Sequence, residues 1–180
     1  WCEFDFARLC NPLPVSGFAC DGTFDKRESV EKVLNDVAYC GRASITRNQE
    51  GYIAWVIDKE RAVATQMFTP RNSWGFQFAR TLKPPPLALK CVYKNADAKW
   101  QDDELWVYAD GYDDSNRPDP SRVETIEFPL FVDSPKELSK YRSGMVYRYA
   151  RYLLEAQALR PEVFSLSADF ESLCCSRGDK

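Results

Sequence analysis

The chain contains no histidine among its 180 residues. Histidine supplies the imidazole base of Ser-His-Asp and Cys-His nucleophile systems, and it is the commonest nitrogen ligand of protein metal sites. Its absence excludes those mechanisms and those sites. The chemistry that is left is a pair of carboxylates, a lysine or cysteine nucleophile, or binding without catalysis.

Long apolar runs and an excess of one charge are also lacking. No stretch approaches the roughly 20 apolar residues that a membrane-spanning helix needs. The 24 Lys and Arg against 27 Asp and Glu leave a net charge of −3, so no global field attracts nucleic acid or an acidic membrane. We therefore expect no nucleic-acid and no membrane partner. The 44% apolar and 28% charged composition is typical of one globular domain, which we expect to span residues 1–180 as a monomer.

Seven cysteines are scattered along the chain: Cys2, Cys10, Cys20, Cys40, Cys91, Cys174 and Cys175. The sequence starts at Trp1 rather than Met, which we interpret as the product of signal-peptide removal. Because an oxidising compartment converts scattered thiols into disulfides, we predict a secreted protein with three bridges and one odd thiol. The vicinal pair is expected to reach the cysteines of the N-terminal arm, with the pairing left open. The paired cysteine knuckles of zinc sites are missing, so we expect no metal ion and no cofactor.

The hydrophobic pattern predicts an α+β fold. Helical spacing predicts a helix from Asp25 to Gly41, with Asp25 and Glu28 as a capping box, and a second helix from Ser134 and Pro135 to Pro161, which Gly144 divides. Strands are predicted over 43–47, 52–58, 62–68, 87–94, 104–110 and 123–132, with a hairpin at Gly51, an ambiguous stretch over 71–82 and a helical turn over 167–173. This order favours an antiparallel sheet of about four to five strands covered by helices and cross-linked by disulfides. Pro129 places its strand at an edge or at a bulge.

Two charged segments invite functional interpretations. Carboxylates crowd into one stretch, where they could serve a hard cation or a two-carboxylate glycosidase: Asp102, Asp103, Glu104, Asp110, Asp113, Asp114 and Asp119. Ser115 stands where a calcium-binding EF-hand loop requires glycine, so we interpret the stretch as a solvated loop and keep a secreted glycosidase as an alternative. Arg177, Gly178 and Asp179 spell an adhesion tripeptide, which we interpret as a charged terminus.

Aromatic residues supply the candidate contact sites. Trp55 and Trp106 lie in predicted strands and are expected in the core, whereas Trp74, beside Arg71 and Gly75, is expected at a surface. The most distinctive run is Tyr147, Arg148, Tyr149, Ala150 and Arg151. A helix would turn Tyr149 inward with both arginines flanking it, whereas a strand would send the arginines to opposite faces. Both alternatives stay open at this point.

That run resembles the short motif of the LARS family, the avirulence effectors that plant-pathogenic fungi secrete. The family motif is Trp-Arg, then Phe or Tyr, any residue, and Arg; Tyr147 stands at the tryptophan position. The resemblance implies a four-stranded antiparallel sheet covered by helices and tied by disulfides, with no known catalytic activity. It also implies virulence and avirulence roles in a host plant, where immune receptors detect some members and other members mask that detection.

A second resemblance is to the ribonuclease-like fungal effectors. The early helix, the run from Asn48 to Val56 and the later Glu127, Phe128 and Pro129 are similar to features of small secreted fungal ribonucleases. Those nucleases use a histidine as acid or base, so on that scaffold the chain would be a catalytically inactive binder.

We therefore expect a secreted fungal effector that acts on a plant host by protein binding, without catalysis. Its partner would be a host protein or an immune receptor. Its location would be the apoplast, with later entry into host cells left open. The candidate contact residues are Tyr147, Arg148, Tyr149, Arg151 and Trp74.

Overall fold

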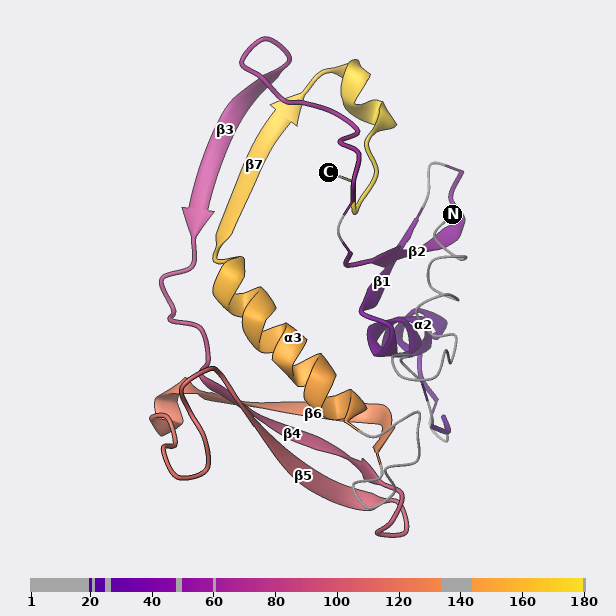
Figure 1. Ribbon diagram of the computed structural model, residues 1–180. Coiled ribbons are helices and arrows are strands. Elements are labelled where there is room, and N and C mark those ends of the chain that lie inside the picture. Colours follow the sequence, from indigo (N-terminus) through magenta and orange to yellow (C-terminus); the bar gives the residue numbers. More distant parts are fainter. Residues whose placement is uncertain are drawn as a thin grey trace.

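The computed structural model describes residues 20, 22–24, 27–47, 50–59, 61–133 and 144–179. This part of the chain is α+β, as predicted (Figure 1). Its elements in chain order are α2 (Val30–Cys40), β1 (Ala43–Arg47), β2 (Ile53–Ile57), β3 (Ser73–Arg80), β4 (Ala88–Asn95), β5 (Gln101–Tyr108), the 3-10 helix η1 (Pro120–Arg122), β6 (Val123–Asp133), α3 (Met145–Leu159), β7 (Glu162–Ala168) and the 3-10 helix η2 (Phe170–Cys174).

The described strands form three small sheets rather than the one antiparallel sheet that we predicted. β1 pairs with β2, β3 pairs with β7, and β5, β4 and β6 form a three-stranded sheet in that order. In this last sheet β4 is antiparallel to β5 but parallel to β6. The reason lies in the order: β5 ends and β6 begins beside Ala88, on opposite sides of β4. β5 and β6, which follow each other in the chain, therefore lie on either side of β4, and β6 runs parallel to β4.

Pro129 lies where its chemistry requires. β6 is an edge strand of the three-stranded sheet, and its register against β4 shifts between Tyr93, which faces Phe128, and Lys94, which faces Val132. Residues 129–131 therefore form a bulge, where the missing N–H of proline costs no ladder hydrogen bond. Both the edge position and the bulge that the sequence predicted are confirmed.

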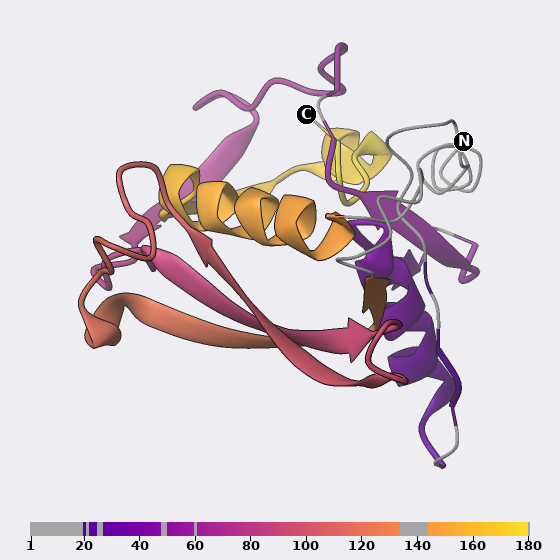
Figure 2. The ribbon, with the colours of Figure 1, turned by 60° about the horizontal axis from the view of Figure 1, so that its bottom comes forward.

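α3 lies across one face of the three-stranded sheet (Figure 2). The side chain of Tyr149 is buried in this layer, and its ring lies 5.0 Å from that of Tyr39 on α2. The same ring lies 5.6 Å from Phe128 and 5.3 Å from Phe131, both on β6. These edge-to-face and tilted contacts join α2, α3 and β6 in one aromatic cluster.

α2 begins later than the sequence suggested. Its N-cap is Ser29, whose side chain accepts a hydrogen bond from the Lys32 backbone N–H at 3.2 Å. Glu28 pairs instead with the Lys32 ammonium group, so the predicted capping box is wrong, and Asp25 lies outside the described residues. Gly41 ends the helix as predicted. α2 then leads into the β1–β2 hairpin, which turns at Gly51 with a φ of +86°.

α3 is described from Gly144 onward. Gly144 occupies the N-cap position with a φ of +77°, a conformation that favours glycine. The helix ends at Leu159, before Pro161, as predicted. The predicted start at Ser134 and Pro135 lies outside the described residues.

A long ribbon made of β3 and β7 continues from the C-terminal end of α3 (Figure 1). The ambiguous stretch over 71–82 thus contains a strand, whereas 62–68 contains none. The helical turn predicted over 167–173 is partly right, because η2 covers 170–174, but residues 162–168 form β7. Phe164 and Leu166 alternate with serines in that segment, and β3 supplies a partner that local sequence could not identify.

The predicted framework of three disulfides is not found among the described residues, where no two cysteines are bonded to each other. Cys2 and Cys10 lie outside that part of the chain. Cys91, Cys174 and Cys175 are free thiols. Cys91 projects from the central strand β4 into the core, whereas the Cys174 thiol, in η2, donates to the Gln66 side-chain oxygen at 3.3 Å. The vicinal pair and Cys91 therefore lie in separate parts of the fold.

We expect Tyr149→Ala to lower the free energy of unfolding by about 3–5 kcal/mol, because it removes the ring shared by three elements. Tyr147→Ala, a matched control on the same helix whose side chain is half-exposed, should cost less than about 1 kcal/mol. Urea unfolding of both variants followed by circular dichroism measures the difference. Equal losses would contradict the aromatic cluster as the centre of the core.

Candidate functional site

The run from Tyr147 to Arg151 is helical, which decides between the two alternatives left open by the sequence. It forms the first turns of α3. Tyr149 is buried, as the helical alternative predicted, and Tyr147 is half-exposed. Arg148 is half-buried on the turn between them. The structure thus places Tyr149 in the core and leaves Tyr147 as the exposed aromatic residue of the run.

Arg151 ties α3 to the loop that follows β5. Its guanidinium donates to the Tyr108 backbone carbonyl at 2.7 Å and to the Asp110 carboxylate at 2.7 Å. It also reaches Glu155, one turn along the helix, at 3.2 Å. The hydrogen bond to Asp110 is the main cause of the raised pKa of Arg151. This arginine therefore orients a loop against the helix, which is a structural role.

A second polar cluster joins the hairpin to α3. The Asp58 carboxylate accepts hydrogen bonds from the Tyr152 hydroxyl and from both terminal nitrogens of Arg160, one of them at 3.1 Å. The guanidinium of Arg42 lies over the Tyr152 ring, 4.8 Å from its centre. A bidentate pairing between a guanidinium and a carboxylate fixes both the distance and the relative orientation of the two side chains. The cluster holds the β1–β2 hairpin in place beside α3.

The electrostatics of the cluster favour this resting arrangement. The hydrogen bonds from Arg160 are the largest cause of the lowered pKa of Asp58, and Tyr152 adds to it. Burial, followed by the hydrogen bond to Asp58, raises the pKa of Tyr152 to about 12. At neutral pH the carboxylate is thus ionised and paired, and the phenol is neutral and donates. Neither group is poised to exchange a proton near pH 7.

A cavity of about 370 Å³ lies beside this cluster. Its lining combines Arg42, Asp58 and Tyr152 with the C-terminal residues Arg177 and Gly178. The Arg177 guanidinium donates to the Ile45 carbonyl at 3.3 Å. Gly178 has a φ of +93°, and a Cβ at this position would lie 2.5 Å from a methyl group of Val56. The C-terminal segment therefore packs against the hairpin.

This packing bears on the adhesion tripeptide. Arg177 is bonded to the hairpin, and the Asp179 carboxylate accepts from the Ser176 backbone N–H at 2.8 Å. Both charged side chains of the tripeptide are thus engaged with the protein itself.

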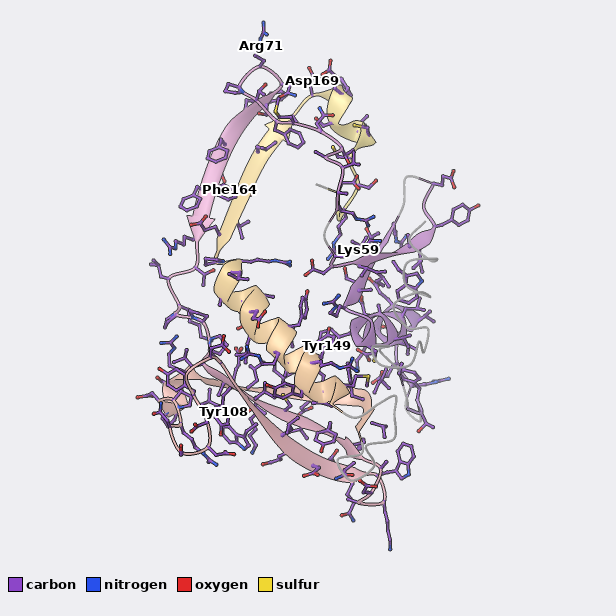
Figure 3. All side chains as sticks on the ribbon, in the orientation of Figure 1. Lys59, Arg71, Tyr108, Tyr149, Phe164 and Asp169 are labelled. Carbon is purple, nitrogen blue, oxygen red and sulfur yellow. The ribbon has the colours of Figure 1, made fainter. Side chains whose placement is uncertain are left out.

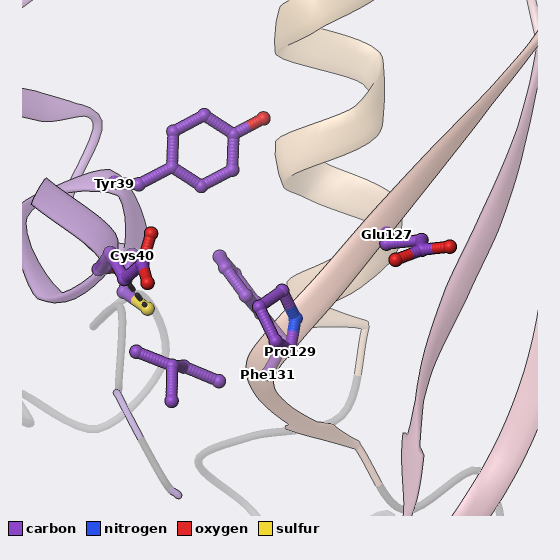
Figure 4. Close-up of a pocket in the computed structure, with 7 residues that line it drawn as sticks. Tyr39, Cys40, Glu127, Pro129 and Phe131 are labelled. Atoms are coloured by element: carbon purple, nitrogen blue, oxygen red, sulfur yellow. Dashed lines mark hydrogen bonds between the residues drawn. The ribbon is translucent and has the colours of Figure 1, made fainter. Parts of the chain in front are cut away.

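A second cavity, of about 350 Å³, lies between the end of α2 and the bulge of β6 (Figure 4). It is lined mainly by apolar side chains, including Tyr39, Leu130 and Phe131. The Cys40 thiol lies at its margin and donates to the Asp36 carbonyl at 3.5 Å. The arrangement offers no convergent set of polar groups for a small ligand.

The acidic residues of the 102–119 stretch each interact with a different local partner. Asp102 pairs with Lys94 and Glu104 pairs with Lys90, each at 2.7 Å. Asp113 accepts from the backbone and hydroxyl of Ser115, which is the main cause of its lowered pKa. In the described ranges, no group of three or more acidic or cysteine side chains is arranged to hold a metal ion. These carboxylates form turns and surface ion pairs.

Trp74 is at the surface, as the sequence predicted, with 58% of its area exposed. It lies on β3 opposite Ser167 of β7. The register places Gln77, Val163 and Ser165 on the same side of the ribbon. We call this side, made of Trp74, Gln77, Ala79, Val163, Ser165 and Ser167, the tryptophan face.

The other side of the ribbon is not predicted from the sequence. Phe164 lies halfway along the ribbon, well apart from Tyr149 in the core (Figure 3). Its ring lies 5.8 Å from that of Phe76 and 5.3 Å from that of Phe78. The alternation of Phe76 with Phe78, and of Phe164 with Leu166, was the available signal. The partnership of the two segments, far apart in the chain, was not readable from it.

No protein-family model matches the chain, and comparison with curated proteins finds no significant relative. Among the described residues, no helix has the length and apolar character needed to cross a membrane.

We expect Asp58→Asn to lower the free energy of unfolding by on the order of 1 kcal/mol at neutral pH, since the side chain is one-third exposed. The folded pKa of Asp58 lies below its unfolded value, so its contribution is present above about pH 4 and is lost as the pH falls through the folded pKa. Unfolding curves at a series of pH values measure this. A wild-type advantage that persists unchanged in strong acid would contradict the ion-paired cluster.

We expect the thiols to react in a fixed order with a disulfide reagent. Cys174 is exposed and should react in the native protein, whereas burial raises the pKa of Cys91 to about 12 and should block its reaction until the chain unfolds. Peptide mapping after timed labelling identifies each site, with Cys174→Ser as the control. Labelling of Cys91 at the rate of Cys174 would contradict the position of β4 in the core.

Proposed function

We propose that the protein is a secreted fungal effector that binds a host plant protein without catalysis, and that the tryptophan face is its contact surface. The observation that carries this proposal is Trp74, a large aromatic side chain held on strand β3 with most of its surface exposed. Isolated exposed indoles are costly to keep in water, and tryptophan is the residue most enriched at the energetic centres of protein interfaces.

The surroundings of Trp74 support a protein partner. The tryptophan face combines one aromatic side chain, a valine and an alanine with one glutamine and two serines, and it carries no charged residue. Interfaces between separately folded proteins have this composition, with an aromatic anchor inside a small polar rim and few charges at the centre. Gly75, with a φ of +64°, allows the bulge that turns the strand beside the indole.

The LARS-like run supports the proposal as part of the scaffold. Tyr149 fills the core, and Arg151 holds the loop after β5, so these two residues act by maintaining the fold. Tyr147 is exposed and Arg148 is half-buried on the same helix, and these two residues are the contact candidates of the run. Apoplastic secretion and detection by plant immune receptors belong to the proposal on the strength of that resemblance.

We expect Trp74→Ser to abolish the plant response without loss of stability. Trp100→Ser is the matched control, because Trp100 is 59% exposed but lies in the β4–β5 turn, away from the ribbon. The two variants and the wild type are infiltrated into leaves of a panel of plant lines, and cell death and pathogen growth are scored, with thermal unfolding as the check on folding.

A response that is lost with Trp74→Ser and kept with Trp100→Ser supports the proposal. A response that survives Trp74→Ser would move the contact surface elsewhere. The absence of any effect of the wild-type protein on plant tissue or on infection would overturn the effector function itself.

A further inference from the structure

The ribbon has a second face with a chemistry of its own. The register pairs Phe78 with Phe164, and the bulge between Trp74 and Gln77 sets Phe76 beside Leu166. We call this set of four side chains, Phe76, Phe78, Phe164 and Leu166, the phenylalanine face. It lies on the side of the ribbon opposite Trp74, because Trp74 faces Ser167 and the side chains of Phe164 and Leu166 alternate with those of Ser165 and Ser167 along β7.

This face is apolar and open to water. Phe76 is 64% exposed, Phe78 is 53% exposed and Phe164 is 58% exposed. The rings contact one another along the ribbon, so they form one continuous patch. No charged side chain stands among the four; Arg80 and Glu162, which are paired in the register, lie only at the end next to α3.

The ribbon is also incomplete as a sheet. β3 and β7 pair with each other and, among the described strands, with no third one. Their extensive contacts with described elements are also confined to each other. A two-stranded ribbon is marginal in water unless a further strand, a helix or another sheet covers its apolar side. The phenylalanine face is the side that requires such a cover.

We infer that a second copy of this chain covers the phenylalanine face, so that two ribbons pack face to face across a two-fold axis. In place of the monomer expected from the sequence, the protein is then a homodimer. The uncharged, purely apolar composition is that of homodimer interfaces, whereas contacts between separately folded partners are more polar. The tryptophan face has the second composition and points away from this interface.

The charges at the two ends of the ribbon fit an antiparallel arrangement of the copies. Arg80 and Glu162 mark the end next to α3. Arg71 and Asp169 lie at the opposite end (Figure 3). These residues place both signs of charge at each end, and a two-fold axis through the middle of the ribbon brings each end of one copy beside the opposite end of the other. Both cations can then face acidic groups, and no like charges are forced together.

The area available is sufficient. A phenylalanine offers roughly 200 Å², so the exposed parts of the three rings and Leu166 amount to on the order of 400 Å² per copy. Two copies thus remove roughly 800 Å² of apolar surface from water through these side chains alone. With the adjoining backbone and the ends of the ribbon, the total reaches the roughly 1,000 Å² that a specific interface needs.

The test is the mass of the full 180-residue chain in solution, measured by light scattering after size-exclusion chromatography and by sedimentation over a wide concentration range. We expect twice the monomer mass of 20.7 kDa. Phe164→Asp and Phe78→Asp each place a charge inside the proposed interface and should weaken dimerisation by about thirtyfold or more. Trp74→Ser, on the opposite face, should keep the dimer.

A second pair of variants guards against misfolding. Phe78→Thr and Phe164→Thr remove the rings but keep a residue that favours strands, and circular dichroism verifies that the fold is kept. Folded variants that have become monomeric support the inference. A wild-type chain that is monomeric at all concentrations overturns it, as does a dimer that survives both substitutions. Because plant responses to Trp74→Ser are scored separately, failure of the dimer leaves the proposed host contact standing, and the reverse also holds.

Discussion

The arrangement of the body depends on the burial of one phenol, that of Tyr149. Its ring contacts α2 through Tyr39 and β6 through Phe128 and Phe131, so a single side chain on α3 fixes the spacing of two other elements. The polar clusters are built around it. Arg151, two residues further along, orients the loop after β5, and Tyr152 carries the hydrogen bond to Asp58 that positions the hairpin. Three residues of α3 thus contact three parts of the molecule: the aromatic core, the loop after β5 and the β1–β2 hairpin.

The sequence pattern predicted those elements correctly that depend only on neighbouring residues. The helix over Val30–Cys40, the hairpin at Gly51 and the edge position of Pro129 each follow from residues a few positions apart. Pairing between distant segments was not readable in this way. The β3–β7 ribbon joins strands about ninety residues apart, and the parallel pairing of β6 with β4 depends on which side of β4 the chain returns. Periodicity gives the face of a strand but not its neighbour.

The candidate site shows the same division. The exposure of Trp74 could be inferred from its polar and glycine neighbours, and the inward orientation of Tyr149 followed from the helical alternative. The number of cysteines led to a wrong prediction of three disulfides, because it does not show where the thiols lie in the fold. Cys91 belongs to the apolar core, whereas Cys174 lies in η2. What distinguishes the two faces of the ribbon is the register between β3 and β7. A one-residue bulge at Gly75 decides that Trp74 and Phe76 lie on opposite sides.

The docking of the C-terminal segment has a mechanical meaning for the ribbon. At one end the ribbon is joined to α3 by the chain itself, because α3 ends at Leu159 and β7 begins at Glu162. At the other end the chain runs through η2 to Arg177 and Gly178, which are held against the hairpin. Both ends of the ribbon are therefore anchored, one to α3 and the other, through η2 and the C-terminal segment, to the β1–β2 hairpin. The aromatic side chains of the ribbon are therefore ordered before a partner binds, so that binding loses less conformational entropy.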